Sequence, residues 1–195
     1  MAYSSTPRRD SSILPIIAAV VVLILGALAA GCTEDSNDNG GQPVIRQPQD
    51  FLPPSTSGML TSGDPSVATD TASLQDVING GYETYTNHGF EEMVYQRYEG
   101  TVSGTSAMAE VKIFDQGTAV HAEALNDEIR QMGQFTWESL SGIGDEAHQG
   151  VGLNAYGIIM RRADYTSELT ITSSTQDAQE LLKLFATHIN NEIQG

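Results

Sequence analysis

The sequence predicts an α+β protein with a single folded domain, in which a mostly antiparallel sheet is packed with helices in the order α-β-β-α-β-β-β-α. Three segments place apolar residues at helical spacing, and the strand-like segments between them follow one another directly. Such runs of neighbouring strands exclude a doubly wound parallel sheet, in which single strands alternate with helices. With 39% hydrophobic residues in a chain of 195, the composition is sufficient for a core.

The three predicted helices differ in how regular their apolar faces are. The first is Ser73–His88, which carries Gly80 and Gly81 in its middle. Each glycine costs about 1 kcal/mol in a helix interior, so the pair predicts a break or a close backbone approach. The other two are Gly117–Met132, with the stripe Ala122, Leu125, Ile129 and Met132, and Thr175–Asn191, with the stripe Ala178, Leu181, Leu182, Phe185 and Ile189.

The predicted strands form two hairpins and one short strand. Alternating or β-branched residues indicate a first hairpin from two strands that are joined by a glycine-containing turn. A short strand follows, with Phe135 and Trp137 on one side, and a second hairpin precedes the last helix. The predicted ranges are Phe90–Glu99 with Thr105–Asp115, then Phe135–Leu140, a turn-like segment Ser141–Gly150, and Leu153–Arg162 with Tyr165–Ser173.

The chain ahead of the domain predicts export. Residues 1–31 are expected to be a signal peptide, residues 32–70 a disordered tether and residues 71–193 the globular domain. Arg8 and Arg9 precede the uncharged run Ile13–Cys32 and acidic residues follow it, which is the layout of a secretory signal. An uncleaved transmembrane helix and plain secretion are the alternatives, because about 19 apolar residues can just span a bilayer. The tether is rich in Pro, Gly, Ser, Asn and Asp, and such a composition buries too little apolar surface to offset chain entropy.

The end of the apolar run carries a more specific pattern. Leu28-Ala29-Ala30-Gly31-Cys32 resembles the lipobox of bacterial lipoproteins, although Ala29 stands where that family more often has Leu. The resemblance implies that the signal is cut before Cys32 and that its thiol carries fatty acids such as palmitate. The protein would then be anchored in the cell membrane by lipid, on the extracytoplasmic side. Cys32 is the single cysteine of the sequence and cannot form an internal disulfide.

A second resemblance covers the domain. Leu74–Tyr98, with Asn79-Gly80-Gly81 and Gly89-Phe90, together with the later steps Gly117-Thr118-Ala119 and Gly144-Asp145, resembles a family of uncharacterised bacterial exported proteins. The similarity extends over roughly residues 70–190, and its motifs are short turn or packing signals. It implies an α/β sandwich and export, and it carries over no activity.

The sequence shows no catalytic or metal-binding motif. The histidines (His88, His121, His148 and His188) have no ligand spacing, so neither a metal nor a cofactor is expected. The net charge of −16 argues against a nucleic-acid partner. Four aromatic residues, Tyr82, Tyr85, Trp137 and Tyr156, are candidates for lining a pocket, and the alternative is that they form an ordinary core.

The resulting interpretation is a non-enzymatic binding or structural module of the cell envelope. It would contact the membrane through the lipid on Cys32 and bind an envelope protein or a small ligand. The alternative is an envelope hydrolase whose His/carboxylate site is assembled only in the fold. That alternative requires His88, His121 or His148 to converge with carboxylates in a cleft.

Overall fold

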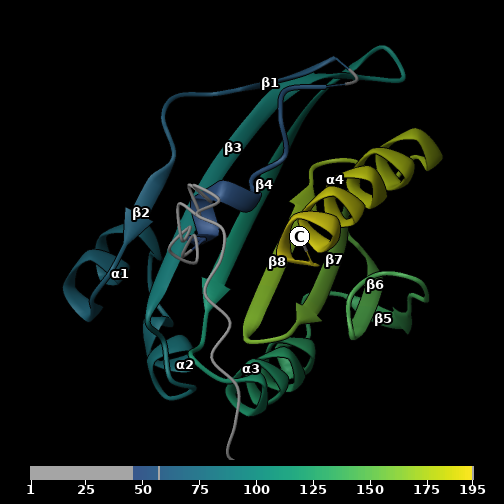
Figure 1. Cartoon of the computed structure of the whole chain (residues 1–195). Helices are drawn as coiled ribbons and strands as arrows, with labels where there is room; N and C mark the ends of the chain where they lie inside the picture. The colour runs from purple at the N-terminus through teal and green to yellow at the C-terminus, as the bar shows by residue number, and fades with distance from the viewer. Residues whose placement is uncertain (1–45, 57, 195) are drawn as a thin grey trace, which may run out of the picture. The chain divides into compact units, whose positions relative to one another are not determined.

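The computed structural model describes residues 46–56 and 58–194 (Figure 1). The predicted signal peptide, Cys32 and the first part of the predicted tether lie outside the described residues. The described residues form one compact unit.

The described part is built on one eight-stranded antiparallel sheet, which confirms the predicted α+β class. The strand order is β1-β3-β4-β8-β7-β6-β5, and β2 also pairs with β3. The strands are β1 Met59–Thr61, β2 Ser66–Ala68, β3 Glu92–Val102, β4 Thr105–Asp115, β5 Thr136–Ser139, β6 Glu146–Gly152, β7 Ala155–Arg162 and β8 Tyr165–Ile171. The helices are the 3₁₀ turn η1 Pro48–Phe51 and the α-helices α1 Thr71–Val77, α2 Tyr82–Thr86, α3 Ala119–Gln131 and α4 Gln176–Gln194.

Helices cover both faces of this sheet (Figure 1). Successive residues of a strand point to opposite faces, so Met93 and Val94 of β3 belong to different cores. The apolar stripe of α4 packs on the face that carries Val94, together with η1 and β1. The helices α1, α2 and α3 pack on the face that carries Met93 and Phe114. The face covered by α1–α3 also holds the candidate site.

The first predicted helix is interrupted where its two glycines lie. α1 ends at Val77 and α2 begins at Tyr82, and both Gly80 and Gly81 adopt positive φ angles of 88° and 72°. Glycine reaches this region without steric cost, so the pair provides a turn that other residues would strain. The predicted break is therefore confirmed.

One strand is missing from the predicted order. The segment Ser141–Gly150 was expected to be a turn, but it contains most of β6, which pairs with both β5 and β7. From residue 71 the observed order is α-α-β-β-α-β-β-β-β-α. β6 lacks the alternation of large apolar side chains, because its buried positions are Ala147, His148 and Gly150.

The N-terminal boundary of the domain, predicted at residue 71, is also wrong. Phe51 and Met59 are buried to 2% and 0% exposure, and β1 and β2 extend the sheet beside β3. The Tyr98 hydroxyl donates a hydrogen bond of 2.7 Å to the Pro53 carbonyl oxygen. The prolines and polar residues of this segment suggested a tether, but a few apolar side chains are sufficient to hold it on the sheet. The folded part therefore includes the described residues before 71.

Candidate functional site

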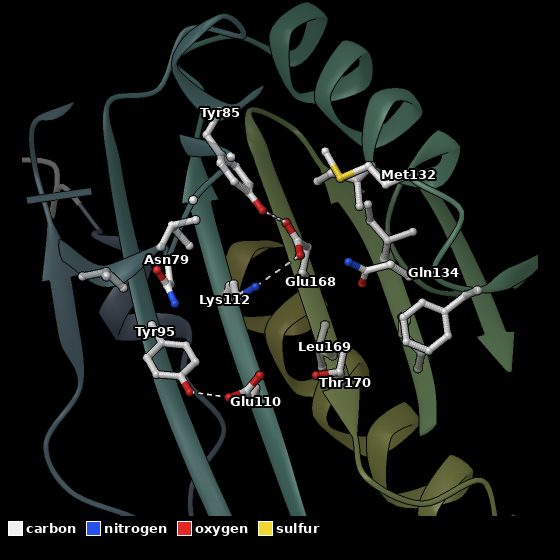
Figure 2. A pocket seen from close by; sticks show the side chains of 18 of the residues that line it. Asn79, Tyr85, Tyr95, Glu110, Lys112, Met132, Gln134, Glu168, Leu169 and Thr170 are labelled. Atoms are coloured by element: carbon white, nitrogen blue, oxygen red, sulfur yellow. Dashed lines mark hydrogen bonds and ion pairs between the residues drawn. The ribbon is translucent and has the colours of Figure 1, made fainter. Parts of the chain in front are cut away.

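A cavity of about 440 Å³ opens on the sheet face that carries α1–α3 (Figure 2). Its walls come from the α1–α2 junction, the end of α3, and the segment that leads from α3 into β5. Its floor comes from the side chains of β3, β4 and β8 and from β7. Sites for small molecules typically have volumes of about 300–1,000 Å³, and this cavity lies in that range.

The floor lies on two rows of residues that are paired across neighbouring strands, and both rows extend beyond it, since Arg97, Gly150, Gly157 and His148 lie outside the lining. Both rows carry charged residues, Arg97 and Glu110 in the first and Lys112 and Glu168 in the second. One row is Arg97, Glu110, Thr170, Gly157, Gly150 and Trp137, and the other is Tyr95, Lys112, Glu168, Ile159 and His148. α3 lies over the next row, where the buried Thr166 hydroxyl donates to the Ala122 carbonyl oxygen at 3.0 Å.

The charged residues of the floor are joined to tyrosines. Tyr85 donates a hydrogen bond of 2.8 Å to Glu168 Oε1, and Tyr95 donates one of 2.6 Å to Glu110 Oε1. Lys112 Nζ lies 3.5 Å from Glu168 Oε2. The negative charge of Glu168 raises the pKa of Lys112, so the ammonium stays protonated at neutral pH. Burial, and then the charge of Glu168, raises the pKa of Tyr85.

One wall of the cavity is aromatic because three glycines leave room for it. The ring centroids of Phe135 and Trp137 lie 5.0 Å apart. A Cβ atom at Gly150 would lie 2.7 Å from Phe135 Cβ and 2.8 Å from Trp137 Cε3, and one at Gly157 would lie 3.1 Å from Phe135 Cζ. Gly152 approaches the Phe135 ring in the same way. The two rings therefore lie against the bare backbone of β6 and β7.

The structure separates the four aromatic residues proposed for a pocket. Tyr85 and Trp137 line the cavity. Tyr82 packs half-buried against the apolar cluster beneath α1–α3, outside the lining. The placement of Tyr156 was wrong, because this residue points to the opposite face, is 1% exposed, and donates to Gln149 Oε1 at 2.7 Å.

The three histidines that the hydrolase alternative invokes lie in three separate places. His88 Nε2 is 2.6 Å from Glu128 Oε2, where α2 ends beside α3. His121 Nδ1 is 3.1 Å from the Gln116 carbonyl oxygen. His148 is 9% exposed beneath Arg130, and its burial, followed by the Arg130 charge, lowers its pKa. No histidine in the described part of the chain lines the cavity, so the convergence that the hydrolase alternative requires is not found there.

Residues 46–56 and 58–194 contain neither a cluster of metal-ligand side chains nor a helix suited to span a membrane. In these ranges there is no group of three or more His, Cys, Asp or Glu side chains arranged to hold a metal ion. None of the helices described there is both long enough and apolar enough to cross a membrane.

Comparisons with known proteins give one structural similarity. No protein-family model matches the chain, and no curated protein matches it either. Among solved structures, the chain is similar to the extracellular domain of PknH from Mycobacterium tuberculosis, with a TM-score of 0.48 and 11% identity over 75% of this chain and 94% of that one. This similarity is too distant to transfer any property from that protein to this chain.

Proposed function

We propose that this chain is an exported, lipid-anchored protein of the bacterial cell envelope whose folded domain binds a small molecule in the cavity. The observation that carries the binding function is the composition of the cavity. Its walls are mainly apolar and aromatic, with the side-chain amides of Asn79 and Gln134 among them, and charged groups meet at its floor. Apolar walls with a few polar groups are the usual composition of a site for a small ligand.

The charged floor favours a binding site over an ordinary core. The side chains of Lys112 and Glu168 are only 27% and 15% exposed. Withdrawing charged groups from water costs free energy, and apolar residues of similar size are often neutral or stabilising in such places. The sheet therefore gains little stability from these charges, whereas a ligand gains partners that fix its orientation.

The anchor rests on Leu28–Cys32 and on the uncharged run before it. Two or more acyl chains hold a protein stably at a membrane, at about 0.8 kcal/mol for each buried methylene group. Cys32→Ser should abolish incorporation of a labelled fatty acid and leave the precursor uncut. Unchanged labelling of the variant would refute the anchor and would leave the cavity untouched.

Ligand binding is tested with a variant that fills the cavity. Thr170 lies at the centre of the floor, between Glu110 and Gly157. Thr170→Phe places a ring there, and Ser106→Phe makes a similar change at an exposed position of β4 outside the lining. The thermal unfolding of full-length protein in non-ionic detergent is followed with and without the low-molecular-weight fraction of bacterial cells and spent medium.

We expect this fraction to raise the Tm of the wild type and of Ser106→Phe, and to leave that of Thr170→Phe unchanged, because a ligand stabilises only the state that binds it. Trp137, the single tryptophan, lines the cavity and reports occupancy directly through its fluorescence. Equal stabilisation of all three proteins, or stabilisation of none, would contradict binding in the cavity. The fluorescence measurement decides the matter if Thr170→Phe fails to fold.

A further inference from the structure

The charged side chains that line the cavity do not balance. Glu110 and Glu168 are negative and Lys112 is positive, and all three point into the cavity from β4 and β8 (Figure 2). The ammonium of Lys112 pairs with Glu168 at 3.5 Å. Glu110 has Arg97 at 3.7 Å, but Arg97 lies outside the lining with its side chain 44% exposed, where solvent weakens the pair. The lining therefore carries one excess negative charge.

Hydrogen-bond acceptors also exceed donors at the floor. A carboxylate offers about four acceptor positions, and each of the two receives one tyrosine hydroxyl. Those two tyrosine donors are thereby used, and the ammonium of Lys112 has three donors, one of them directed at Glu168. At the floor the unused capacity is mainly that of carboxylate oxygens, whereas the amides of Asn79 and Gln134 on the walls offer both donors and acceptors. A ligand that supplies donors and positive charge complements this floor.

The aromatic residues around this floor favour the same kind of ligand. Tyr85, Tyr95, Phe135 and Trp137 come from four different segments and line one cavity. A cation over the face of an aromatic ring gains about 0.5–2 kcal/mol, and apolar groups of the ligand gain from burial against the same rings. The whole chain carries a net charge of −16, which raises the local concentration of cations and lowers that of anions.

We infer that the ligand of the cavity is a small organic cation, a protonated amine joined to an apolar or aromatic group. This inference rests on the proposed function and adds to it the class of the ligand. The amine is held by Glu110 and Glu168 at the floor, and the apolar group lies against Phe135 and Trp137.

Three probes of similar size and different charge test the inference. Benzylammonium is positive, benzyl alcohol is neutral and phenylacetate is negative. Each is titrated at low ionic strength into full-length protein in non-ionic detergent, and the fluorescence of Trp137 is recorded. We expect the cation to bind about tenfold more tightly than the alcohol, with phenylacetate giving no saturable change. Added salt should weaken the binding of the cation.

Two variants with the same charge change locate the effect. Glu110→Gln removes a charge from the lining, and Glu99→Gln removes one from an exposed position of β3 outside it. We expect Glu110→Gln to weaken the binding of the cation by about fivefold and Glu99→Gln to leave it unchanged. Glu168→Gln serves as the second lining variant if thermal unfolding shows that Glu110→Gln is not folded.

The outcomes separate this inference from the proposed function. Binding of the alcohol or of phenylacetate as tightly as the cation would overturn the inference, and so would equal effects of Glu110→Gln and Glu99→Gln. If no probe binds while the low-molecular-weight fraction still stabilises the wild type and not Thr170→Phe, the inference fails and ligand binding stands. If neither the probes nor the fraction bind, both fail.

Discussion

The contact between the Phe135 ring and Gly157 on β7 can be tested with Gly157→Val. This substitution should destabilise the wild type and stabilise a variant that lacks the Phe135 ring. A Cβ atom there would lie 3.1 Å from Phe135 Cζ and 3.2 Å from its two Cε atoms. The backbone at this position is ordinary strand, which a β-branched residue fits well. Gly157→Val therefore combines a favourable change in strand propensity with an unfavourable contact against the Phe135 ring.

The two effects differ in size. Replacing a glycine inside a strand by a β-branched residue stabilises by up to about 1 kcal/mol, whereas overpacking costs about 1–3 kcal/mol. In the wild type we expect Gly157→Val to lower the free energy of unfolding by about 1–2 kcal/mol. For a domain of about 150 residues this lowers the Tm by about 2–8 °C. In a Phe135→Ala background the contact is gone, so the same substitution should raise the Tm by about 2–4 °C.

The assay is thermal unfolding of the wild type, both single variants and the double variant, followed by circular dichroism. The emission of Trp137, whose ring centroid lies 5.0 Å from that of Phe135, shows whether the wall has moved. The reversal of sign between the two backgrounds is the critical result. A shift of the same direction and size in both would show that the Phe135 ring does not rest on β7, and the aromatic wall described above would be wrong.

Three further predictions concern the rest of the fold. A chain that begins at Thr71 lacks η1, β1 and β2, and with them the buried side chains of Phe51 and Met59, each of which stabilises by about 1.5–3 kcal/mol. In urea unfolding this chain should therefore be about 3–6 kcal/mol less stable than one that begins at Pro43. The pKa of His148 is lowered in the folded state, so the unfolded state binds more protons below about pH 6.5. The free energy of unfolding should therefore fall as the pH drops from 7 to 5, and His148→Gln should reduce this fall. Gly89 and Gly133 have similar φ angles of 76° and 73°, but a Cβ atom at Gly89 would lie 2.1 Å from Nδ1 of the His121 ring, whereas one at Gly133 would meet nothing within 4 Å. In thermal unfolding Gly89→Ala should therefore cost about 1–3 kcal/mol more than Gly133→Ala.

The strands that were predictable from the sequence are those with one apolar face. β4 occupies the predicted range Thr105–Asp115, because Ala109, Val111 and Ile113 alternate with polar residues and pack beneath α4. β8 was predictable for the same reason, because Tyr165, Ser167, Leu169 and Ile171 alternate with polar residues. β6 was not, because it has glycine at positions 150 and 152, where the side chains of Phe135 and Trp137 lie close to its backbone. Its composition is set by its neighbours and is not visible in the pattern of its own residues.

The site was less predictable than the fold. Aromatic residues could be proposed for a pocket from composition. Successive residues of a strand point to opposite faces, however, and the position of Tyr156 in β7 directs it to the face under α4, away from the cavity. Glu110, Lys112 and Glu168 gave no signal, because charged residues that alternate with apolar ones usually face solvent. Only the register of β4 against β8 shows that Lys112 and Glu168, 56 positions apart in the chain, lie directly opposite each other.

That register links the site to the core on the opposite face. A shift of β8 by one residue would move Glu168 among the apolar side chains under α4 and turn the side chain of Leu169 away from that core. Burial of an unpaired carboxylate is costly, and the loss of Leu169 from the core adds to that cost, so the shifted pairing is strongly disfavoured. The apolar face therefore determines the register, and the charged side chains of the cavity need not stabilise it. Their identity is consequently open to selection for ligand binding.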